Sequence, residues 1–325
     1  MFHQLTFAQA SKNKSNGNKP LSAKDAPNTS SLPGGLFVKI YHDQPGENIK
    51  PGDVIKMNFI QKNGRDSIYT STYDNGMAQV FPVPLKMYTG DINDVLTHFS
   101  EGDSVHFKIN LDTMAFYSKQ PKPAQYENDN YLSFEVKIEK VFKKNEGEAD
   151  SIFQQRAQAY FQADYHAVIE RLKNGEEAKI DAYLADRKLK MTTTTSGLRY
   201  LILNAGNSQR AVDTDTLVLN YTGSLTRKGT NGKYKVFDTN IEQVAKENHV
   251  FQDGRPYGPT KMGANAAVPG FSEALKLIGV GGKIQIVIPS KLGYGDAGAP
   301  EAGINPFAPI FFEIEITELI KVNPN

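Results

Sequence analysis

The sequence predicts an α+β protein with two similar half-wrapped antiparallel β-sheets, each carrying a short helix, joined by a helical connector. Three observations predict this fold: an internal repeat, apolar residues that alternate with period two inside each copy, and an amphipathic stretch between the copies. The chain has 325 residues, of which 39% are hydrophobic. That length suits two compact units plus tails.

The internal repeat consists of three blocks that follow the same order in both copies. Residues 35–59 align with residues 197–221. Further along, Val105, Phe107 and Ile109 match Ile284, Ile286 and Ile288, and residues 134–136 match residues 312–314. Because the offsets between matching blocks stay nearly constant, we expect two copies of one fold.

Each copy is expected to be mostly strands with one short helix. In the second copy, Leu217, Leu219 and Tyr221 share one face of a strand by period-two alternation. Pro269 suits the first turn of a helix, and Gly279 suits its end. A twisted sheet covered on one face by such a helix gives the predicted α+β unit.

These patterns divide the chain into four regions. Residues 1–34 are predicted to be a flexible N-terminal tether, because residues 11–34 are rich in Ser, Asn, Lys, Gly and Pro and almost lack apolar side chains. A tail without a function is the alternative for this region. The first copy is assigned to residues 35–145, the helical connector to 146–190 and the second copy to 191–325.

The connector is predicted to contain two helices. The first runs from Asp150 to about Lys173, and the second from about Glu176 to Lys188 after a stop at Asn174-Gly175. The first helix has one apolar face, formed by Phe153, Ala157, Phe161, Tyr165, Val168 and Leu172. This face packs either on the protein's own domains or against a second copy of the chain in a homodimer, and the sequence leaves both open.

Composition argues against several classes of function. The formal net charge is +1, so there is no field of one sign to attract nucleic acid or an anionic membrane. The chain has no cysteine, which excludes disulfides, thiolate metal sites and a cysteine nucleophile. No stretch of about 18 apolar residues exists, so no membrane span is expected. The first ten residues lack the basic region of a typical signal peptide.

No cofactor or metal is expected either. Residues 293–298 match the dinucleotide pattern G-x-G-x-x-G, but this pattern needs a helix directly after it, and the Pro- and Gly-rich residues 299–306 predict a loop. The six histidines show no helical i, i+4 pair of the kind that binds zinc.

Four segments of the second copy carry the functional prediction. They are residues 218–225, which end a strand; residues 236–239, where an aromatic side chain precedes a carboxylate; residues 267–271, which open the helix; and residues 292–295, which begin a loop running to Phe312. Any one of these aromatic residues alone would more often be plain core. As an ordered set they resemble the FKBP family of peptidyl-prolyl cis/trans isomerases over about 130 residues.

The resemblance implies a pocket for a proline ring. Its catalytic residues would be Tyr221, Phe237 and Phe312 as aromatic walls, Asp238 at the rim as a hydrogen-bond acceptor, and Tyr294, whose hydroxyl meets a substrate carbonyl. The substrate-binding residues would be Phe271 as the floor, Val268 and Ile304 through backbone groups, Ala267, and Tyr257 as a weak candidate for a further aromatic wall. The resemblance also implies unfolded or flexible proline-containing chains as partners and macrolides as small ligands.

The residues depart from the family pattern at several positions. Phe271 stands where the family usually has Trp, and Ala267 and Val268 stand where it usually has two bulky aliphatics. The segment 241–261 is longer than usual, which obscures the counterpart of the wall assigned to Tyr257. We therefore expect an active site with altered specificity.

The required chemistry is simple. Rotation about a peptide bond has a barrier of about 18–20 kcal/mol, because resonance gives the C–N bond double-bond character. An apolar pocket favours the less polar, twisted imide over the planar form. No proton moves and no bond breaks, so no base, nucleophile or metal is needed.

The first copy is predicted to be degenerate. Phe59 stands in place of Tyr221, and Tyr69-Thr70 replaces the Phe237-Asp238 pair. The alternative to catalysis is a module or holdase chaperone that binds proline segments without turnover. Similar tandem proteins belong to bacterial cell envelopes, so the resemblance implies the envelope or periplasm, with the cytoplasm as the alternative.

Overall fold

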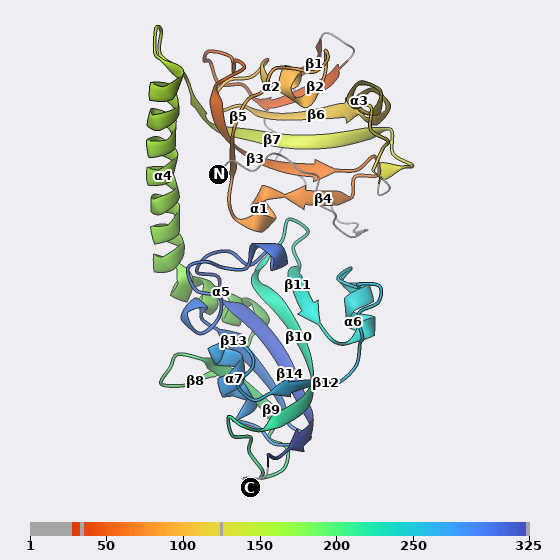
Figure 1. Ribbon diagram of the computed structural model, residues 1–325, viewed down its shortest axis with the longest axis vertical. Helices are drawn as coiled ribbons and strands as arrows, with labels where there is room; N and C mark the ends of the chain where they lie inside the picture. The colour runs from red at the N-terminus through yellow and green to blue at the C-terminus, as the bar shows by residue number, and fades with distance from the viewer. Residues whose placement is uncertain (1–27, 33–35, 124–125, 323–325) are drawn as a thin grey trace. The chain divides into compact units, whose positions relative to one another are not determined.

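The computed structural model describes residues 28–32, 36–123 and 126–322. The chain divides into two compact units, residues 1–164 and residues 165–325. Each unit contains one seven-stranded antiparallel sheet (Figure 1).

The first unit has the strand order β1-β2-β6-β7-β3-β4, and β5 pairs with β3. Its strands are β1 (Asn28–Leu32), β2 (Leu36–His42), β3 (Val54–Lys62), β4 (Ile68–Ser71), β5 (Gln79–Pro82), β6 (Ser104–Asn110) and β7 (Tyr131–Phe142). Its short helices are α1 (Thr72–Asn75), α2 (Ile92–Leu96) and α3 (Leu111–Ser118).

The second unit has the strand order β11-β10-β14-β13-β9-β8, and β12 pairs with β10. Its strands are β8 (Thr192–Thr193), β9 (Arg199–Asn204), β10 (Thr216–Lys228), β11 (Tyr234–Thr239), β12 (Thr260–Gly263), β13 (Lys283–Ile288) and β14 (Ile310–Ile320). Its short elements are α6 (Glu242–Glu247), α7 (Pro269–Leu275) and the 3₁₀ turns η2 (Ser290–Leu292) and η3 (Pro300–Ala302). Strand for strand, this is the order of the first unit, so the predicted α+β fold with two antiparallel sheets is confirmed. Each sheet is, however, accompanied by more than the one short helix that was predicted.

The core of the second unit follows from alternation along its strands. On β13 and β14, Ile284, Ile286, Phe312 and Ile314 face α7 and are buried with it. The helix ends at Leu275 rather than at Gly279 as predicted. Gly279 lies in the following turn, where an added Cβ would stand 2.3 Å from the Asn207 carbonyl oxygen, so close packing explains this glycine.

The two connector helices are α4 (Asp150–Asn174) and α5 (Glu176–Arg187), within a residue of the predicted bounds. The start of α4 packs on the first unit, where Phe153 and Ala157 bury against Val54 and Phe142. In contrast, α5 packs on the second unit. The region predicted as a separate connector is therefore divided between the units, and the second unit begins well before residue 191.

The predicted tether is also shorter than expected at its C-terminal end. Residues 28–32 form β1, which pairs with β2. Residues 1–27 and 33–34 of the predicted tether lie outside the described residues. Among the helices that the structure describes, none is both long enough and apolar enough to cross a membrane.

Candidate active site

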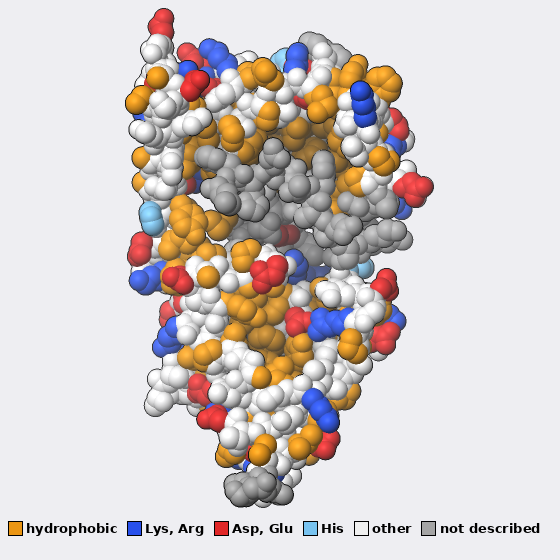
Figure 2. Space-filling model, viewed as in Figure 1, with side chains coloured by type: hydrophobic (Ala, Val, Ile, Leu, Met, Phe, Trp, Pro, Cys, Tyr) orange, Lys and Arg blue, Asp and Glu red, His pale blue; other side chains and the backbone are white. Residues whose placement is uncertain are grey.

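Four aromatic side chains from four elements meet on the concave side of the second sheet. Tyr221 comes from β10, Phe237 from β11, Phe312 from β14 and Phe271 from α7. The ring of Phe312 lies 5.0 Å from Phe271, 5.5 Å from Phe237 and 6.3 Å from Tyr221, measured between centroids. The first two pairs are edge-to-face, an arrangement that aromatic quadrupoles favour. Figure 2 shows hydrophobic side chains gathered over the part of this unit where Figure 1 places β10 and β14.

The missing side chain of Gly223 makes room for these rings. Gly223 pairs with Asp238 on one side and Phe312 on the other. A Cβ built at Gly223 would stand 2.5 Å from Phe312 Cε1 and 2.8 Å from Phe237 Cζ. Only glycine therefore lets both rings take their places.

Asp238 is held at the rim by two partners. The Tyr221 hydroxyl donates to Asp238 Oδ2 at 2.8 Å, and Arg255 Nη1 forms an ion pair with Oδ1 at 2.8 Å. Arg255 Nη2 also reaches the Tyr221 hydroxyl at 3.3 Å. Asn240 fixes the same region, because its Oδ1 accepts the Tyr221 backbone N–H at 2.8 Å. These contacts form a polar network beside the four aromatic rings.

The environment keeps the Tyr221 hydroxyl protonated. Burial, and then its hydrogen bond to the Asp238 carboxylate, raise the pKa of Tyr221 to about 12. Burial, followed by the charges of Asp238 and Glu301, likewise raises the pKa of Tyr294. Both hydroxyls are consequently donors at neutral pH.

Tyr294 lies in the loop after β13. The loop begins with η2, and Gly295 takes a left-handed backbone conformation with φ of 62°. Tyr294 is 37% exposed, so part of its surface is accessible to a bound chain. The negative charge of Asp238 contributes to the raised pKa of Tyr294, so these two predicted site residues interact electrostatically.

Three of the remaining predicted residues are packed in the core or bonded to their own loop. Ala267 and Val268 are partly buried at the start of α7 and pack against the core. Ile304 is buried, but its N–H donates to the Ala299 carbonyl at 3.0 Å and its carbonyl accepts from Ala299 N–H at 2.8 Å. The Ile304 N–H is thus engaged with Ala299, and the role of Ile304 in substrate binding stays a prediction.

Tyr257 is not packed into the aromatic cluster. Its ring stacks on Phe251 at 5.1 Å, and its hydroxyl accepts the Gln252 N–H at 2.9 Å. Its ring contacts Arg255, whose guanidinium lies 5.5 Å from the ring centroid and pairs with Asp238. Sequence reasoning missed Arg255, although the unusual length of segment 241–261 marked the region where it lies.

In the part of the first unit that the structure describes, side chains occupy the place that corresponds to Gly223. By strand register, Gln61 takes the place of Gly223, because it pairs with Thr70 and Phe134 as Gly223 pairs with Asp238 and Phe312. Gln61 donates to the hydroxyl of Tyr126 at 3.1 Å, and the Tyr126 ring is 99% buried, 5.0 Å from Tyr69. The Gln61 and Tyr126 side chains are therefore accommodated in the first unit where Gly223 carries no side chain in the second.

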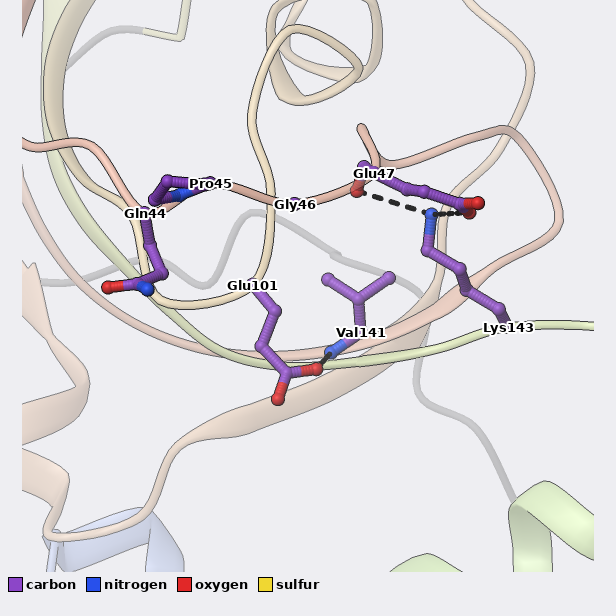
Figure 3. A pocket seen from close by; sticks show the side chains of 7 residues that line it. All are labelled: Gln44, Pro45, Gly46, Glu47, Glu101, Val141 and Lys143. Carbon is purple, nitrogen blue, oxygen red and sulfur yellow. Dashed lines mark hydrogen bonds and ion pairs between the residues drawn. The ribbon is translucent and has the colours of Figure 1, made fainter.

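The first unit does have an open cavity of about 500 Å³ (Figure 3), lined by Gln44, Pro45, Gly46, Glu47, Glu101, Val141 and Lys143. Its charged groups are already partnered: Glu47 pairs with Lys143 at 3.1 Å, and Glu101 accepts the Val141 N–H at 3.0 Å. This cavity shares no residue with the aromatic cluster and was not predicted from the sequence.

Comparisons with known proteins point to one family. A family model described as FKBP-type peptidyl-prolyl cis-trans isomerase matches residues 207–317. FKBP-type peptidyl-prolyl cis-trans isomerase FkpA of Escherichia coli K12 is 31% identical in an alignment of 162 residues that covers 46% of this chain and 52% of that protein. Outer membrane protein MIP of Legionella longbeachae is 30% identical over 175 residues, 53% of this chain and 64% of that protein.

A crystal structure of FkpA from Escherichia coli aligns with 55% of this chain and 76% of that chain, with 29% identity and a TM-score of 0.41. The match to the FkpA sequence spans about half of that relative's length.

Proposed function

Because residues 207–317 form a domain of the FKBP type, we propose that this protein is a peptidyl-prolyl cis/trans isomerase acting on X-Pro bonds in unfolded or flexible segments. The observation that carries the proposal is the convergence of four aromatic rings with the Tyr221–Asp238–Arg255 network at their rim. An apolar pocket bordered by hydrogen-bonding groups suits a proline ring whose flanking peptide groups stay polar.

The mechanism follows from differential binding. The proline ring enters between Phe237, Phe271 and Phe312, where the planar, more polar imide loses water without compensation. The twisted imide is less polar, so the loss of water costs it less free energy. The pocket therefore favours the twisted transition state. The protonated Tyr294 hydroxyl donates to a substrate carbonyl and fixes the chain. A five-decade acceleration needs about 7 kcal/mol in total, at about 1.36 kcal/mol per decade.

The test is protease-free isomerisation of X-Pro peptides by the full chain, compared with Asp238→Ala and Tyr294→Phe. Asp238→Ala leaves Arg255 without its carboxylate partner, and Tyr294→Phe removes only the hydroxyl. We expect clear acceleration by the native chain and about a tenfold or larger reduction in each variant. A folded native chain that gives no acceleration would refute the proposal.

A second function, binding of unfolded segments without turnover, is favoured by one observation on the first unit. Leu85, Met87 and Phe116 are 79%, 65% and 76% exposed, and Tyr117 is 49% exposed. In Figure 2, hydrophobic side chains appear over α3, which carries the last two. Exposed Met and aromatic side chains suit adaptable apolar contacts. Aggregation suppression that survives Tyr294→Phe but is lost in Leu85→Ser/Phe116→Ser would assign chaperone function to the first unit.

We further propose that the protein works in a bacterial cell envelope, supported by the similarity to a protein named as an outer membrane protein.

We also propose that the chain forms a homodimer through α4, because Ile152 and Tyr165 on this helix are 53% and 45% exposed. Light scattering of Tyr165→Glu beside the native chain tests the dimer. The resemblance also implies that macrolides bind as small ligands. Competition by a macrolide in the isomerisation assay tests whether one binds at the proposed site.

A further inference from the structure

Helix α5 lies against the face of the second sheet that is opposite the aromatic cluster. Ile180 and Tyr183 are buried there against Val287 of β13 and Phe311 of β14. Because side chains alternate along a strand, Phe311 faces α5 while its neighbour Phe312 faces the pocket. The helix and the aromatic cluster therefore contact opposite faces of β14.

The C-terminal end of α5 is attached to the sheet by polar contacts. Asp186 pairs with Lys228 of β10 at 2.7 Å and accepts the Tyr234 hydroxyl of β11 at 2.7 Å. The guanidinium of Arg187 lies 5.7 Å from the Phe311 ring. Together with the buried face, these contacts fix the position of the helix on the sheet.

The N-terminal end of α5 reaches the loop that carries Tyr294. Glu176 Oε2 accepts the Ser290 hydroxyl at 2.8 Å, and Glu176 Oε1 accepts the Ser290 backbone N–H. Ser290 is 3% exposed and is the first residue of η2. Two hydrogen bonds to one carboxylate fix both the backbone and the side chain of this residue.

Ser290 in turn organises the backbone around Tyr294. Its carbonyl accepts the N–H of Gly293 at 2.9 Å and that of Gly295 at 2.8 Å. These are the two residues that flank Tyr294. A continuous set of hydrogen bonds therefore runs from Glu176 on α5 through Ser290 to both neighbours of the tyrosine.

We propose that Glu176 is a positioning residue for the isomerase site: it sets the conformation of the loop that presents the Tyr294 hydroxyl to the substrate. This proposal rests on the proposed isomerase function and adds a residue outside the matched segment 207–317 to its machinery. It predicts that the activity depends on α5 as well as on the domain that carries the aromatic cluster.

The experiment is a double-mutant cycle in the full chain between Glu176→Ala and Tyr294→Phe, measured by protease-free isomerisation. Glu176→Ala leaves both Ser290 donors without their acceptor, so we expect kcat to fall about tenfold with little change in KM. Glu176→Gln keeps an oxygen for the backbone N–H and offers a donor to the hydroxyl, so it should retain most of the activity. Glu177→Ala is the matched control, because that neighbouring carboxylate pairs with Arg199 of β9 and not with Ser290.

The cycle distinguishes positioning from general stabilisation. In the Tyr294→Phe background, Glu176→Ala should have almost no further effect, because the hydroxyl it positions is already gone. An equal loss in both backgrounds, or no loss from Glu176→Ala alone, would overturn the proposal while leaving the isomerase function intact. Inactivity of the native chain itself would instead refute the proposed function. Hydrogen exchange at the Gly293 and Gly295 amides should quicken in Glu176→Ala and stay unchanged in Glu177→Ala.

Discussion

Gly223→Ala introduces a single methyl group at the narrowest point of the aromatic cluster. That Cβ would lie 2.5 Å and 2.9 Å from two atoms of the Phe312 ring and 2.8 Å from Phe237. Because the backbone of Gly223 is not in the left-handed region, alanine meets no conformational penalty there. The whole effect therefore comes from overlap with two proposed pocket walls.

The magnitude follows from this overlap. Inserting a methyl group into a packed site costs about 1–3 kcal/mol, because the rings shift from their preferred positions. For a unit of this size, about 2–4 °C is lost per kcal/mol, so we expect a fall in the melting temperature of about 2–12 °C. Catalysis should suffer more than stability, with kcat/KM reduced about tenfold or more, since the displaced rings enclose the proline.

Thermal unfolding and peptide isomerisation on the same samples check both values. Gly263→Ala on β12 is the matched control, because a Cβ there meets only Ala266, at an ordinary 3.5 Å, and its φ is not positive. Gly223→Ala with native activity and native melting temperature would refute the assignment of Phe237 and Phe312 as pocket walls.

Three further outcomes are expected. A chain starting at residue 190 should melt lower and bind more of a hydrophobic dye than one starting at residue 165, because removing α5 exposes Val287 and Phe311; equal melting curves would contradict the packing of α5. Because Tyr221 has a pKa of about 12 when folded and about 10 when unfolded, its contribution to stability is complete below pH 10 and is lost as the pH rises towards 12. Urea unfolding of Tyr221→Phe should therefore show a shallower alkaline loss than the native chain. Isomerase activity should be flat from about pH 6 to 9, since the Tyr221 and Tyr294 hydroxyls remain protonated; a bell-shaped profile would show that another titrating group takes part.

The sequence was sufficient to predict the central strands and the two connector helices, because each leaves a periodic signal. Period-two alternation located β10, β13 and β14, and the repeat placed their counterparts in the first unit. The spacing of apolar residues and the Asn174-Gly175 stop predicted α4 and α5 almost to the residue. An apolar helical face does not specify which sheet it covers, however, so the assignment of α5 to the second unit required the structure.

Site residues were predictable where the family motif is local, and less so where a contact joins distant segments. Tyr221, Phe237, Phe271 and Phe312 meet as the motif implies. In contrast, Arg255 reaches Asp238 from a segment of unusual length, and Glu176 reaches Ser290 across 114 residues of sequence. Such contacts depend on the fold bringing two segments together, and they leave no periodic pattern in either segment.

The first unit has the same sheet as the second but different side chains at the positions that match the candidate site. The sequence predicted the loss of polar groups, since Phe59 lacks a hydroxyl and Thr70 lacks a carboxylate. The register adds a steric cause, because Gln61 stands where Gly223 leaves space and Tyr126 is buried beside Tyr69. Restoring the polar pair alone, by Phe59→Tyr and Thr70→Asp, should therefore yield no isomerase activity in the first unit when the second carries Tyr294→Phe and Asp238→Ala. Activity gained from that restoration would show that polar groups, and not packing, separate the two copies.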